Sequence, residues 1–307
     1  MKILNLKQYE LVFTTSFYTK HGVSGHMYEL IDYYYVCKKA GINCAILLAD
    51  GVDKEAFLNA VQYKYNLDID ILADTHQCHN PRIIMTNNIC LVDGSWRVND
   101  CTIYADNAFL LRCSEDDFTF FDKNKSIKKS HIMQDFKLYP ERFEDLNVEV
   151  VDYIKKILWS KYAQPKPTNS NTGLFYLTTN CRAIPVEEVQ VIMDKGICNK
   201  YLIVTDKPKI YGHLASDTVE VVQAPVQNIF EHFDTYIYTT TELRSDCSPR
   251  FVVECAVFGK QVVYEIDYVC AGLERRKQDI EQDLPALELT VDDQFVSYVK
   301  QFIYDTN

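Results

Sequence analysis

The sequence lacks any long hydrophobic run. Its most apolar stretches, such as residues 42–49, are far shorter than the ~20 residues that a membrane-spanning helix needs. Met1 leads directly into Lys2, and no basic, apolar and small-residue pattern of a signal peptide follows. These absences argue against a membrane or secreted protein, and we expect a soluble chain in the cytoplasm.

Paired cysteine motifs are missing as well. The 11 cysteines are an odd number and form no C-x-x-C pair, which argues against a zinc site or a disulfide framework. Several of them, such as Cys44, Cys90 and Cys255, lie inside apolar runs. The pattern favours buried, reduced thiols in a reducing compartment.

An excess of positive charge is also lacking. The formal net charge is −11, whereas a protein whose main task is to hold nucleic acid is usually basic. A local basic patch can still act over roughly 8–10 Å, the range that salt leaves to exposed charges. The charge therefore makes a nucleic-acid partner less expected without excluding it.

The sequence does contain a regular alternation of strand-length apolar runs and helical stretches. Its 307 residues, 47% of them hydrophobic, suffice for about two domains. In the first half we predict helices at residues 26–40 and 53–65, the first ended by Gly41. Strands are predicted at residues 10–15, 42–48, 69–72, 83–85, 89–92, 102–104 and 109–111. This alternation is typical of βαβ units with a parallel sheet.

A segment rich in proline and asparagine, residues 164–173 (QPKPTNSNTG), is the best linker candidate. The alternation then restarts, with strands predicted at residues 174–178, 200–204, 219–222, 236–239 and 262–266. Helices are predicted at residues 185–193, 226–232, 250–258 and 289–304, the last started by Thr290 and Asp292. We therefore expect an α/β protein with domains at residues 1–165 and 166–290, and a C-terminal helix at residues 291–307 that packs back on the first domain.

The richest candidate site lies in residues 239–267, where a strand, a polar loop and a helix follow one another. Ligands of open α/β sheets bind beyond the carboxyl ends of the strands. Asp246 and Ser248 can cap the helix, whose N-terminus attracts phosphate. Arg250 offers a fork of donors to phosphate oxygens, and Glu254, one turn later, can accept hydrogen bonds from ribose hydroxyls. The alternative is an ordinary surface ion pair between Arg250 and Glu254.

The same segment resembles the donor-binding motif of GT-B glycosyltransferases, which reads E-x7-E followed by a small residue and G-K-P-V in the large retaining family. This chain has Asp246 and Glu254 in a D-x7-E arrangement, then Ala256 and the run Gly259 to Val262 (GKQV). The resemblance implies that Glu254 binds the donor ribose. It also implies that Asp246, with a shorter arm than the family's glutamate, contacts the sugar.

The order Arg-x-x-x-Glu is also similar to that of phage DNA β-glucosyltransferases, in which the arginine meets the diphosphate and the glutamate the ribose. Arg250 and Glu254 match that order. Those enzymes also carry diphosphate-binding arginines in the loop after the first strand of the C-terminal domain, which implies the same role for Arg182. A solvated turn arginine is the alternative there.

A glycine-containing loop, His21 to His26 (HGVSGH), follows the first predicted strand. It is no Walker or Rossmann fingerprint. It is similar to the G-G-x-x-x-H loop that opens many GT-B enzymes, which implies that Gly22, Ser24 and Gly25 approach the donor. A plain strand-to-helix turn is the alternative.

A catalytic base is the hardest role to assign, since inverting transfer needs a carboxylate or histidine to take the proton of the acceptor hydroxyl. The candidates are Asp106, Asp93 and His21. Asp106 follows a predicted strand as the catalytic acid of the phage enzymes does, so it is preferred. Either aspartate can instead be a turn residue.

These resemblances imply two Rossmann-like domains facing a cleft (GT-B), with the acceptor at the first domain and the nucleotide sugar at the second. The activity implied is glycosyltransfer, hexosyl or pentosyl, with a UDP-sugar as the favoured donor. Arginines and a helix N-terminus can stabilise the leaving diphosphate, so no cofactor is required and a divalent metal is possible but not implied.

The acceptor implied is a hydroxymethylated pyrimidine in phage DNA, which also fits a chain with 21 tyrosines and would place the enzyme in the host cytoplasm. Double-stranded DNA would then meet a basic cluster whose usual alternative is a solvated loop, namely Lys123, Lys125, Lys128, Lys129 and His131. Alternative acceptors are a cell-surface polysaccharide or a lipid-linked molecule. A non-catalytic nucleotide-sugar-binding module and a nucleotide-sugar epimerase of similar fold remain as alternatives of other classes.

Overall fold

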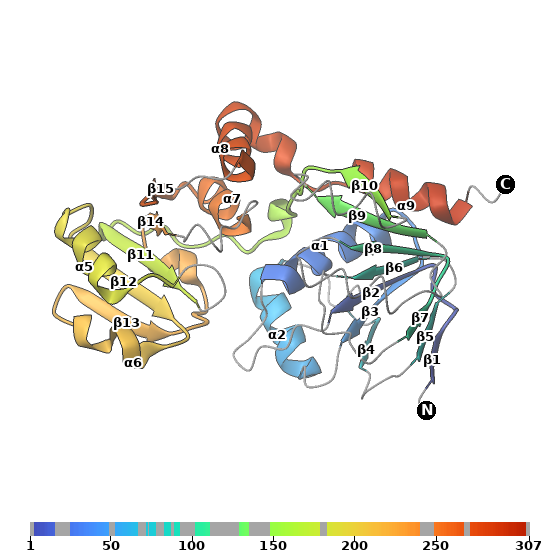
Figure 1. The fold of residues 1–307 in the computed structure, drawn as a ribbon, viewed down its shortest axis with the longest axis horizontal. Coiled ribbons are helices and arrows are strands. Elements are labelled where there is room, and N and C mark those ends of the chain that lie inside the picture. The colour runs from blue at the N-terminus through green and yellow to red at the C-terminus, as the bar shows by residue number, and fades with distance from the viewer. Residues whose placement is uncertain are drawn as a thin grey trace. The chain divides into compact units, whose positions relative to one another are not determined.

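Parallel strands and helices build two α/β units in this computed structural model (Figure 1). The first unit comprises Met1–Tyr162 with Glu288–Asn307, and the second comprises Ala163–Leu287. The structure describes residues 3–15, 25–48, 53–66, 72, 74–77, 83–86, 89–92, 102–110, 129–134, 148–178, 183–239, 249–266 and 271–304.

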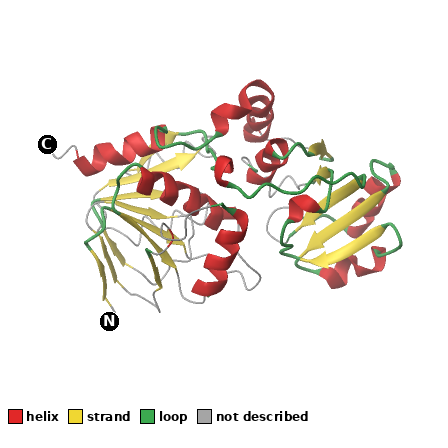
Figure 2. Cartoon of the chain, turned by 180° about the vertical axis from the view of Figure 1, so that it is seen from behind, coloured by secondary structure: helices red, strands yellow, loops and turns green. Residues whose placement is uncertain are grey.

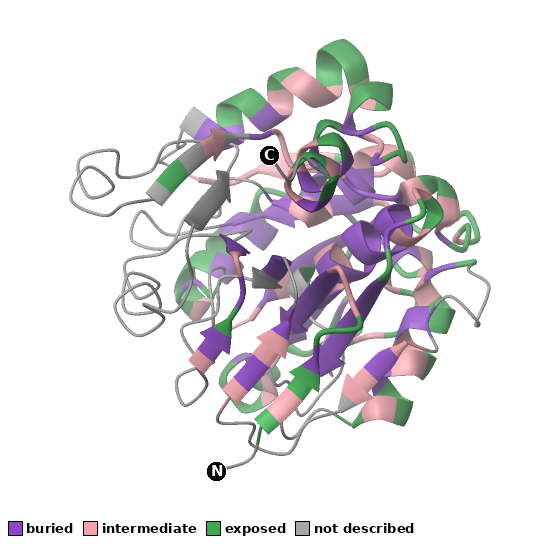
Figure 3. Cartoon of the chain, turned by 90° about the vertical axis from the view of Figure 1, so that its right-hand side faces the viewer, coloured by how far each residue is buried: buried purple, intermediate pink, exposed green. Residues whose placement is uncertain are grey.

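The first unit contains a 7-stranded parallel sheet of order β10-β9-β8-β6-β2-β3-β4 among the described residues. Its strands are β2 (Leu11–Thr15), β3 (Cys44–Leu48), β4 (Thr75–Gln77), β6 (Ile89–Val92), β8 (Asn107–Leu110), β9 (Lys129–Gln134) and β10 (Val148–Asp152). Every residue of β3 is buried, as a continuous apolar run predicts for a strand covered on both faces. Buried residues concentrate on the strands and on the helix faces turned towards them (Figure 3).

A smaller parallel sheet of order β1-β5-β7 adjoins the large one. It consists of β1 (Ile3–Leu6), β5 (Ile83–Thr86) and β7 (Thr102–Tyr104). Each of these strands is followed in sequence by a strand of the large sheet, namely β2, β6 or β8. The strands β1, β5 and β7 have the same order in the small sheet as β2, β6 and β8 have in the large sheet. The carboxyl end of each small-sheet strand is therefore followed by the amino end of a large-sheet strand.

The first two helices form as the sequence predicts. Helix α1 (Gly25–Lys39) is followed by Gly41 with a φ of +85°, a backbone conformation that favours glycine. Helix α2 (Lys54–Lys64) starts after Asp53. The carboxylate of Asp53 accepts hydrogen bonds from the backbone N–H groups of Glu55 and Ala56, at 2.9 and 3.1 Å. Of the strand predicted at residues 69–72, only Leu72 is described, and it lies in a 3-10 turn.

The C-terminal helix α9 (Gln294–Tyr304) is part of the first unit. The buried carboxylate of Asp293 caps it and also accepts the hydroxyl of Tyr153 at 2.8 Å. Lys156 pairs with the same carboxylate at 2.8 Å, and aromatic rings of α9 pack against Phe109 of β8. The observed cap is therefore Asp293 rather than the predicted Thr290 or Asp292.

The second unit is built on a 5-stranded parallel sheet of order β13-β12-β11-β14-β15. Its strands are β11 (Thr172–Leu177), β12 (Lys200–Thr205), β13 (Val219–Gln223), β14 (Thr235–Tyr238) and β15 (Gln261–Tyr264). Helices α5 (Val186–Asp194) and α6 (Pro208–Tyr211) contribute to the core on one face of the sheet, and α7 (Arg250–Val257) and α8 (Ala271–Asp283) to the core on the other (Figure 2). This is a doubly wound arrangement.

One predicted helix of the second unit is wrong. Residues 226–232 form only a 3-10 turn at Ile229–Glu231. Asn228, directly before it, has a left-handed backbone with a φ of 52°, and a right-handed helix cannot pass through such a residue. The connection between β13 and β14 therefore contains a 3-10 turn in place of the predicted helix.

Candidate functional site

The strand order of the second unit defines where a ligand is expected. From β11 the chain moves to β12 and β13 on one side, and it returns to β14 and β15 on the other side of β11. Neighbouring strands whose connections diverge in this way leave a crevice at their carboxyl ends, and ligands of open α/β sheets bind there. The connections that leave this point lead from β11 to α5 and from β14 to α7.

All predicted donor residues of the second domain belong to these two connections or to α7. Arg182 follows β11 in sequence, and Asp246 and Ser248 follow β14. These three residues lie outside the described residues. Arg250 and Glu254 are described, and the geometry of the site rests on them.

Arg250 and Glu254 form a closely packed ion pair in the first turns of α7. The Nε of Arg250 donates to Oε1 of Glu254 at 2.8 Å, and the two side chains are 14% and 3% exposed. An exposed pair of this spacing contributes little to stability, but a buried charge is tolerated only with a partner. The burial therefore sets this pair apart from the ordinary surface pair that was the alternative.

Aromatic packing fixes the first turn of α7 against the sheet. The ring of Phe251, the residue after Arg250, stacks on Tyr176 of β11 at 5.6 Å and on Phe230 at 4.9 Å between centroids. It also meets Tyr236 of β14 edge-on at 4.9 Å. The helix begins at Arg250 after Pro249, whose side chain makes no capping hydrogen bond. The backbone that carries Arg250 is thus held by β11 and β14, the two strands of the crevice.

The last part of the D-x7-E…GK motif has a structural role that the sequence did not indicate. Gly259, with a φ of +65°, ends α7. The ammonium of Lys260 then donates to the carbonyl of Phe233 at 2.8 Å and to Oγ1 of Thr168 at 3.1 Å. Lys260 directly precedes β15, so it lies at the amino edge of the sheet, opposite the crevice.

Lys260 belongs to a polar cluster around Asp234. Burial raises the pKa of Asp234, but hydrogen bonds from Thr168, Thr172 and Ser170, together with the charge of Lys260, outweigh burial and lower the pKa overall. The backbone N–H groups of Ser170 and Thr172 both lie 3.1 Å from the Asp234 carboxylate. The segment predicted as a linker is therefore fastened to the second unit.

The first unit has a corresponding crevice at the carboxyl ends of β2 and β6. From β2 the chain moves to β3 and β4 on one side and to β6 and β8 on the other. The predicted glycine loop leads from β2 to α1, but His21, Gly22 and Ser24 lie outside the described residues. Gly25 is the first residue of α1, and a Cβ there would meet no atom within 4 Å, so protein packing does not demand a glycine.

The two candidate carboxylate bases differ in their place on the first sheet. Asp106 is half-buried in the corner between β7 and β8, at the amino end of β8, and so at the edge opposite the crevice. Asp93 follows the last residue of β6 in sequence but lies outside the described residues. The topology thus favours Asp93 over Asp106, against the preference drawn from the sequence.

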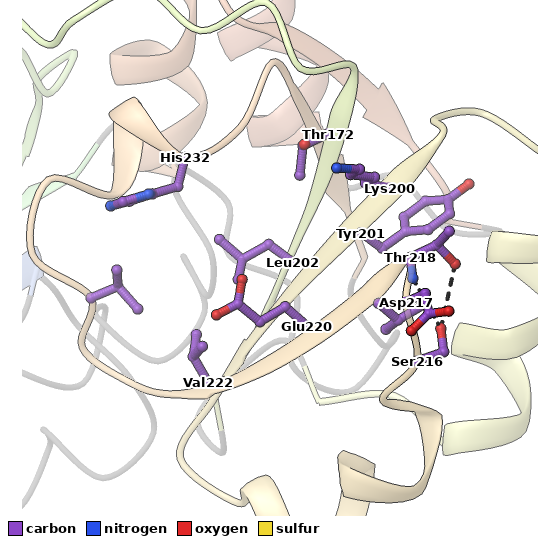
Figure 4. Close-up of a pocket in the computed structure, with 12 residues that line it drawn as sticks. Thr172, Lys200, Tyr201, Leu202, Ser216, Asp217, Thr218, Glu220, Val222 and His232 are labelled. Carbon is purple, nitrogen blue, oxygen red and sulfur yellow. Dashed lines mark hydrogen bonds between the residues drawn. The ribbon is translucent and has the colours of Figure 1, made fainter.

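A pocket of about 310 Å³ lies at the other edge of the second sheet (Figure 4). Thr172, Lys200 and Val219, the first residues of β11, β12 and β13, line it together with Glu220 and His232. Because it opens at the amino ends of these strands, it is not the crevice in which a nucleotide is expected.

The described residues hold no group of three or more histidine, cysteine, aspartate or glutamate side chains arranged for a metal ion. No helix in the described part of the chain combines the length and hydrophobicity needed to cross a lipid bilayer. The described cysteines are buried, as predicted: Cys37, Cys44, Cys90, Cys198 and Cys255. Of the basic cluster, only the backbones of Lys129 and His131, in β9, are described, while Lys123, Lys125 and Lys128 lie outside the described residues.

No family model matches the sequence, and no curated protein is detectably similar to it in sequence. Among solved structures, the chain is similar to the pneumococcal O-GlcNAc transferase GtfA in complex with UDP and GlcNAc, with a TM-score of 0.51 and 9% identity over 96% of each chain. The glycosyltransferase from Rickettsia africae ESF-5 matches at 9% identity and a TM-score of 0.44, over 99% of this chain and 94% of that one.

An alpha-glucosyltransferase in complex with UDP-glucose and DNA containing an abasic site matches at 9% identity, with a TM-score of 0.46 over 99% of this chain and 95% of that one. The likeness to GtfA confirms the predicted fold class, an α/β protein with two Rossmann-like domains of the GT-B kind.

Proposed function

We propose that the chain is a glycosyltransferase that takes a hexosyl or pentosyl group from a UDP-sugar. The observation that carries the proposal is the buried Arg250–Glu254 pair, at the start of the helix that follows β14 at the crevice of a GT-B-type unit. The similarity to GtfA, which was solved with UDP and GlcNAc, supports this choice of donor.

The second unit would hold the donor. Arg250 meets the diphosphate and Glu254 the ribose, while Arg182, Asp246 and Ser248 complete the site. Gly22, Ser24 and Gly25 of the first unit would approach the donor through their backbone. The leaving diphosphate gains negative charge as the sugar departs, and fixed guanidinium and N–H donors stabilise that charge. The donor then needs no metal ion for its activation.

The first unit would hold the acceptor, with Asp93 as the base that takes the proton of its hydroxyl. His21 and Asp106 are the other candidates for the base. The proposed acceptor is a hydroxymethylated pyrimidine of phage DNA, which the Arg-x-x-x-Glu order and the 21 tyrosines favour. The basic residues Lys123 to Lys129 would contact the DNA backbone.

Donor binding is tested by thermal unfolding with UDP-sugars and GDP-sugars. UDP-sugars should raise the melting temperature, and Glu254→Ala should abolish the rise. Glu220→Ala is the matched control, because Glu220 is an exposed carboxylate of β13 at the opposite edge of the same sheet. An unchanged shift in Glu254→Ala, or no shift with any nucleotide sugar in the natural protein, would contradict the proposal.

Sugar transfer is tested by UDP release in the presence of acceptors. Duplex DNA containing hydroxymethylated pyrimidine should stimulate release, whereas the same duplex with unmodified pyrimidine should not. Stimulation by an oligosaccharide or a lipid-linked acceptor alone would replace the DNA acceptor and keep the enzyme class. Donor binding without release on any acceptor would favour the non-catalytic module.

A further inference from the structure

In the ion pair between Arg250 and Glu254, one particular nitrogen of the guanidinium makes the contact. The contact to Oε1 of Glu254 is made by Nε of Arg250, at 2.8 Å. A guanidinium carries five N–H donors in one plane, and Nε carries only one of them. An anion that binds Arg250 while this contact persists would use the terminal nitrogens, of which Nη1 is buried in this structure.

Glu254 is in a position to fix the direction of that plane. Its carboxylate is only 3% exposed, and a buried carboxylate retains its charge only beside a partner. The two side chains share one helix face because they are four residues apart. The first turn of α7 is held by the stacking of Phe251 on Tyr176 and Phe230, so the backbone that carries Arg250 is fixed against the sheet.

We infer that Glu254 is a positioning residue for Arg250, and that the two act as a single clamp for a diphosphate. The inference rests on the proposed function and adds to it. The ribose contact that the resemblance implies would affect the binding of ligands with a ribose only. A positioning role of Glu254 would affect the binding of every ligand with a diphosphate. Paired N–H donors on a fixed plane match two phosphate oxygens, and this match is lost when the plane can turn.

The two roles of Glu254 are separated by ligands that carry only part of the donor. Inorganic pyrophosphate has the two phosphates but no ribose, base or sugar. If Glu254 positions Arg250, its removal weakens pyrophosphate binding. If Glu254 contacts the ribose alone, its removal leaves pyrophosphate binding unchanged or strengthens it, because a negative charge beside the phosphates is lost.

The experiment measures the binding of UDP and pyrophosphate to the full chain by calorimetry. Glu254→Ala should weaken pyrophosphate by roughly 10- to 100-fold, the effect of one charge-assisted hydrogen bond. Glu254→Gln should restore most of this affinity, since its amide oxygen can still accept the N–H of Nε. In an Arg250→Ala background, Glu254→Ala should cause no further loss for pyrophosphate, because coupled residues are not additive.

Two further variants protect the test against a folding defect in Glu254→Ala. Glu254→Asp keeps the charge but shortens the arm, and it should lose pyrophosphate affinity although the carboxylate remains. Glu220→Ala, an exposed carboxylate on the same unit, should leave all affinities unchanged. Circular dichroism and the melting temperature establish that each variant is folded.

The outcomes distinguish the inference from the proposed function. If Glu254→Ala and Glu254→Asp weaken UDP but leave pyrophosphate unchanged, the positioning role is wrong and the nucleotide site stands. If the natural protein binds UDP but no pyrophosphate, the positioning role is wrong as well. If it binds neither UDP nor a UDP-sugar, the proposed function itself has failed.

Discussion

The described residues of the D-x7-E…GK motif lie at two different edges of the second sheet. Arg250 and Glu254 lie at the start of α7, next to the crevice strands, while Lys260 lies past the end of α7 at the amino edge. A helix that connects parallel strands must carry the chain back across the sheet, so residues at its two ends lie towards opposite edges of the sheet. The arginine and glutamate of the motif are thus candidates for binding, and its lysine stabilises the fold.

The Asp234 cluster gives a prediction about stability and pH. Asp234→Asn should lower the free energy of unfolding by about 1 kcal/mol at pH 7, since charge-assisted hydrogen bonds weaken and the site is partly screened by water. The pKa of Asp234 in the folded state is lowered, so the stabilisation that its carboxylate provides is fully present above the unfolded-state pKa of ~3.9. It is lost as the pH falls through the folded pKa.

Urea unfolding between pH 7 and pH 2.5 checks this prediction. The difference between the natural protein and Asp234→Asn should shrink as the pH falls below about 4. Asp217→Asn, at an exposed turn of the same unit, is the matched control. A difference that stays constant at all pH values would show that the charge of Asp234 contributes nothing.

A second prediction at this scale concerns the base. Asp93→Asn should reduce the rate of transfer by roughly 100- to 10,000-fold, the usual contribution of a general base, while UDP still raises the melting temperature. Asp106→Asn, at the amino end of β8, should transfer at nearly the natural rate. UDP release in the presence of the acceptor measures both, and the reverse ranking would restore Asp106 as the base.

At the scale of elements, local signals account for what the sequence predicted correctly. Gly41 ends α1, Asp53 caps α2, and the apolar run of β3 is buried throughout. The sequence of β9 (KSHIMQ) and that of α8 (AGLERRKQDIEQD) are largely polar, so neither strand nor helix was predicted there. Their structure depends on pairing with β8 and β10 and on packing against α7, which no local pattern records.

The candidate site was predictable to a similar extent. The spacing of Arg250 and Glu254 indicated a shared helix face, and the structure adds the burial and the Nε contact. The position of Asp106 could not be predicted, because its strand belongs to a second sheet whose corner precedes β8. In sequence, an acidic residue after a strand looks the same whether it lies at the carboxyl edge or at the amino edge of the main sheet.

The close packing of Gly173 in β11 leads to a prediction about the stability of the second unit. A Cβ at Gly173 would lie 3.0 Å from Cδ1 of Tyr201, 3.1 Å from Sγ of Cys198 and 3.1 Å from Cδ1 of Ile237. Gly173→Ala should therefore lower the free energy of unfolding by about 1–3 kcal/mol, as overpacking does. Gly212→Ala is the control, since a Cβ there meets nothing within 4 Å. Equal unfolding midpoints in urea for the two variants would contradict the prediction.

On the scale of the whole molecule, the second unit is continuous in sequence, whereas the first is completed by residues from the far end of the chain. Helix α9 contributes Phe295, Val296, Val299 and Ile303 to the buried residues of the first unit. A defect on the buried face of α9 should therefore weaken the first unit and leave the stability of the second unchanged, if each unit unfolds around its own core.

Val299→Asp tests this expectation, because Val299 is 0% exposed and an unpaired buried carboxylate costs several kcal/mol. Ser297→Asp is the matched control, since it places the same side chain on the exposed face of the same helix. Calorimetry of Val299→Asp should show the unfolding transition of the first unit at a lower temperature than in the natural protein. The second transition, whose midpoint temperature UDP should raise, should keep the midpoint that it has in the natural protein. If the UDP-sensitive transition moves by as much as the other, the two units do not unfold independently, and α9 stabilises the second unit as well.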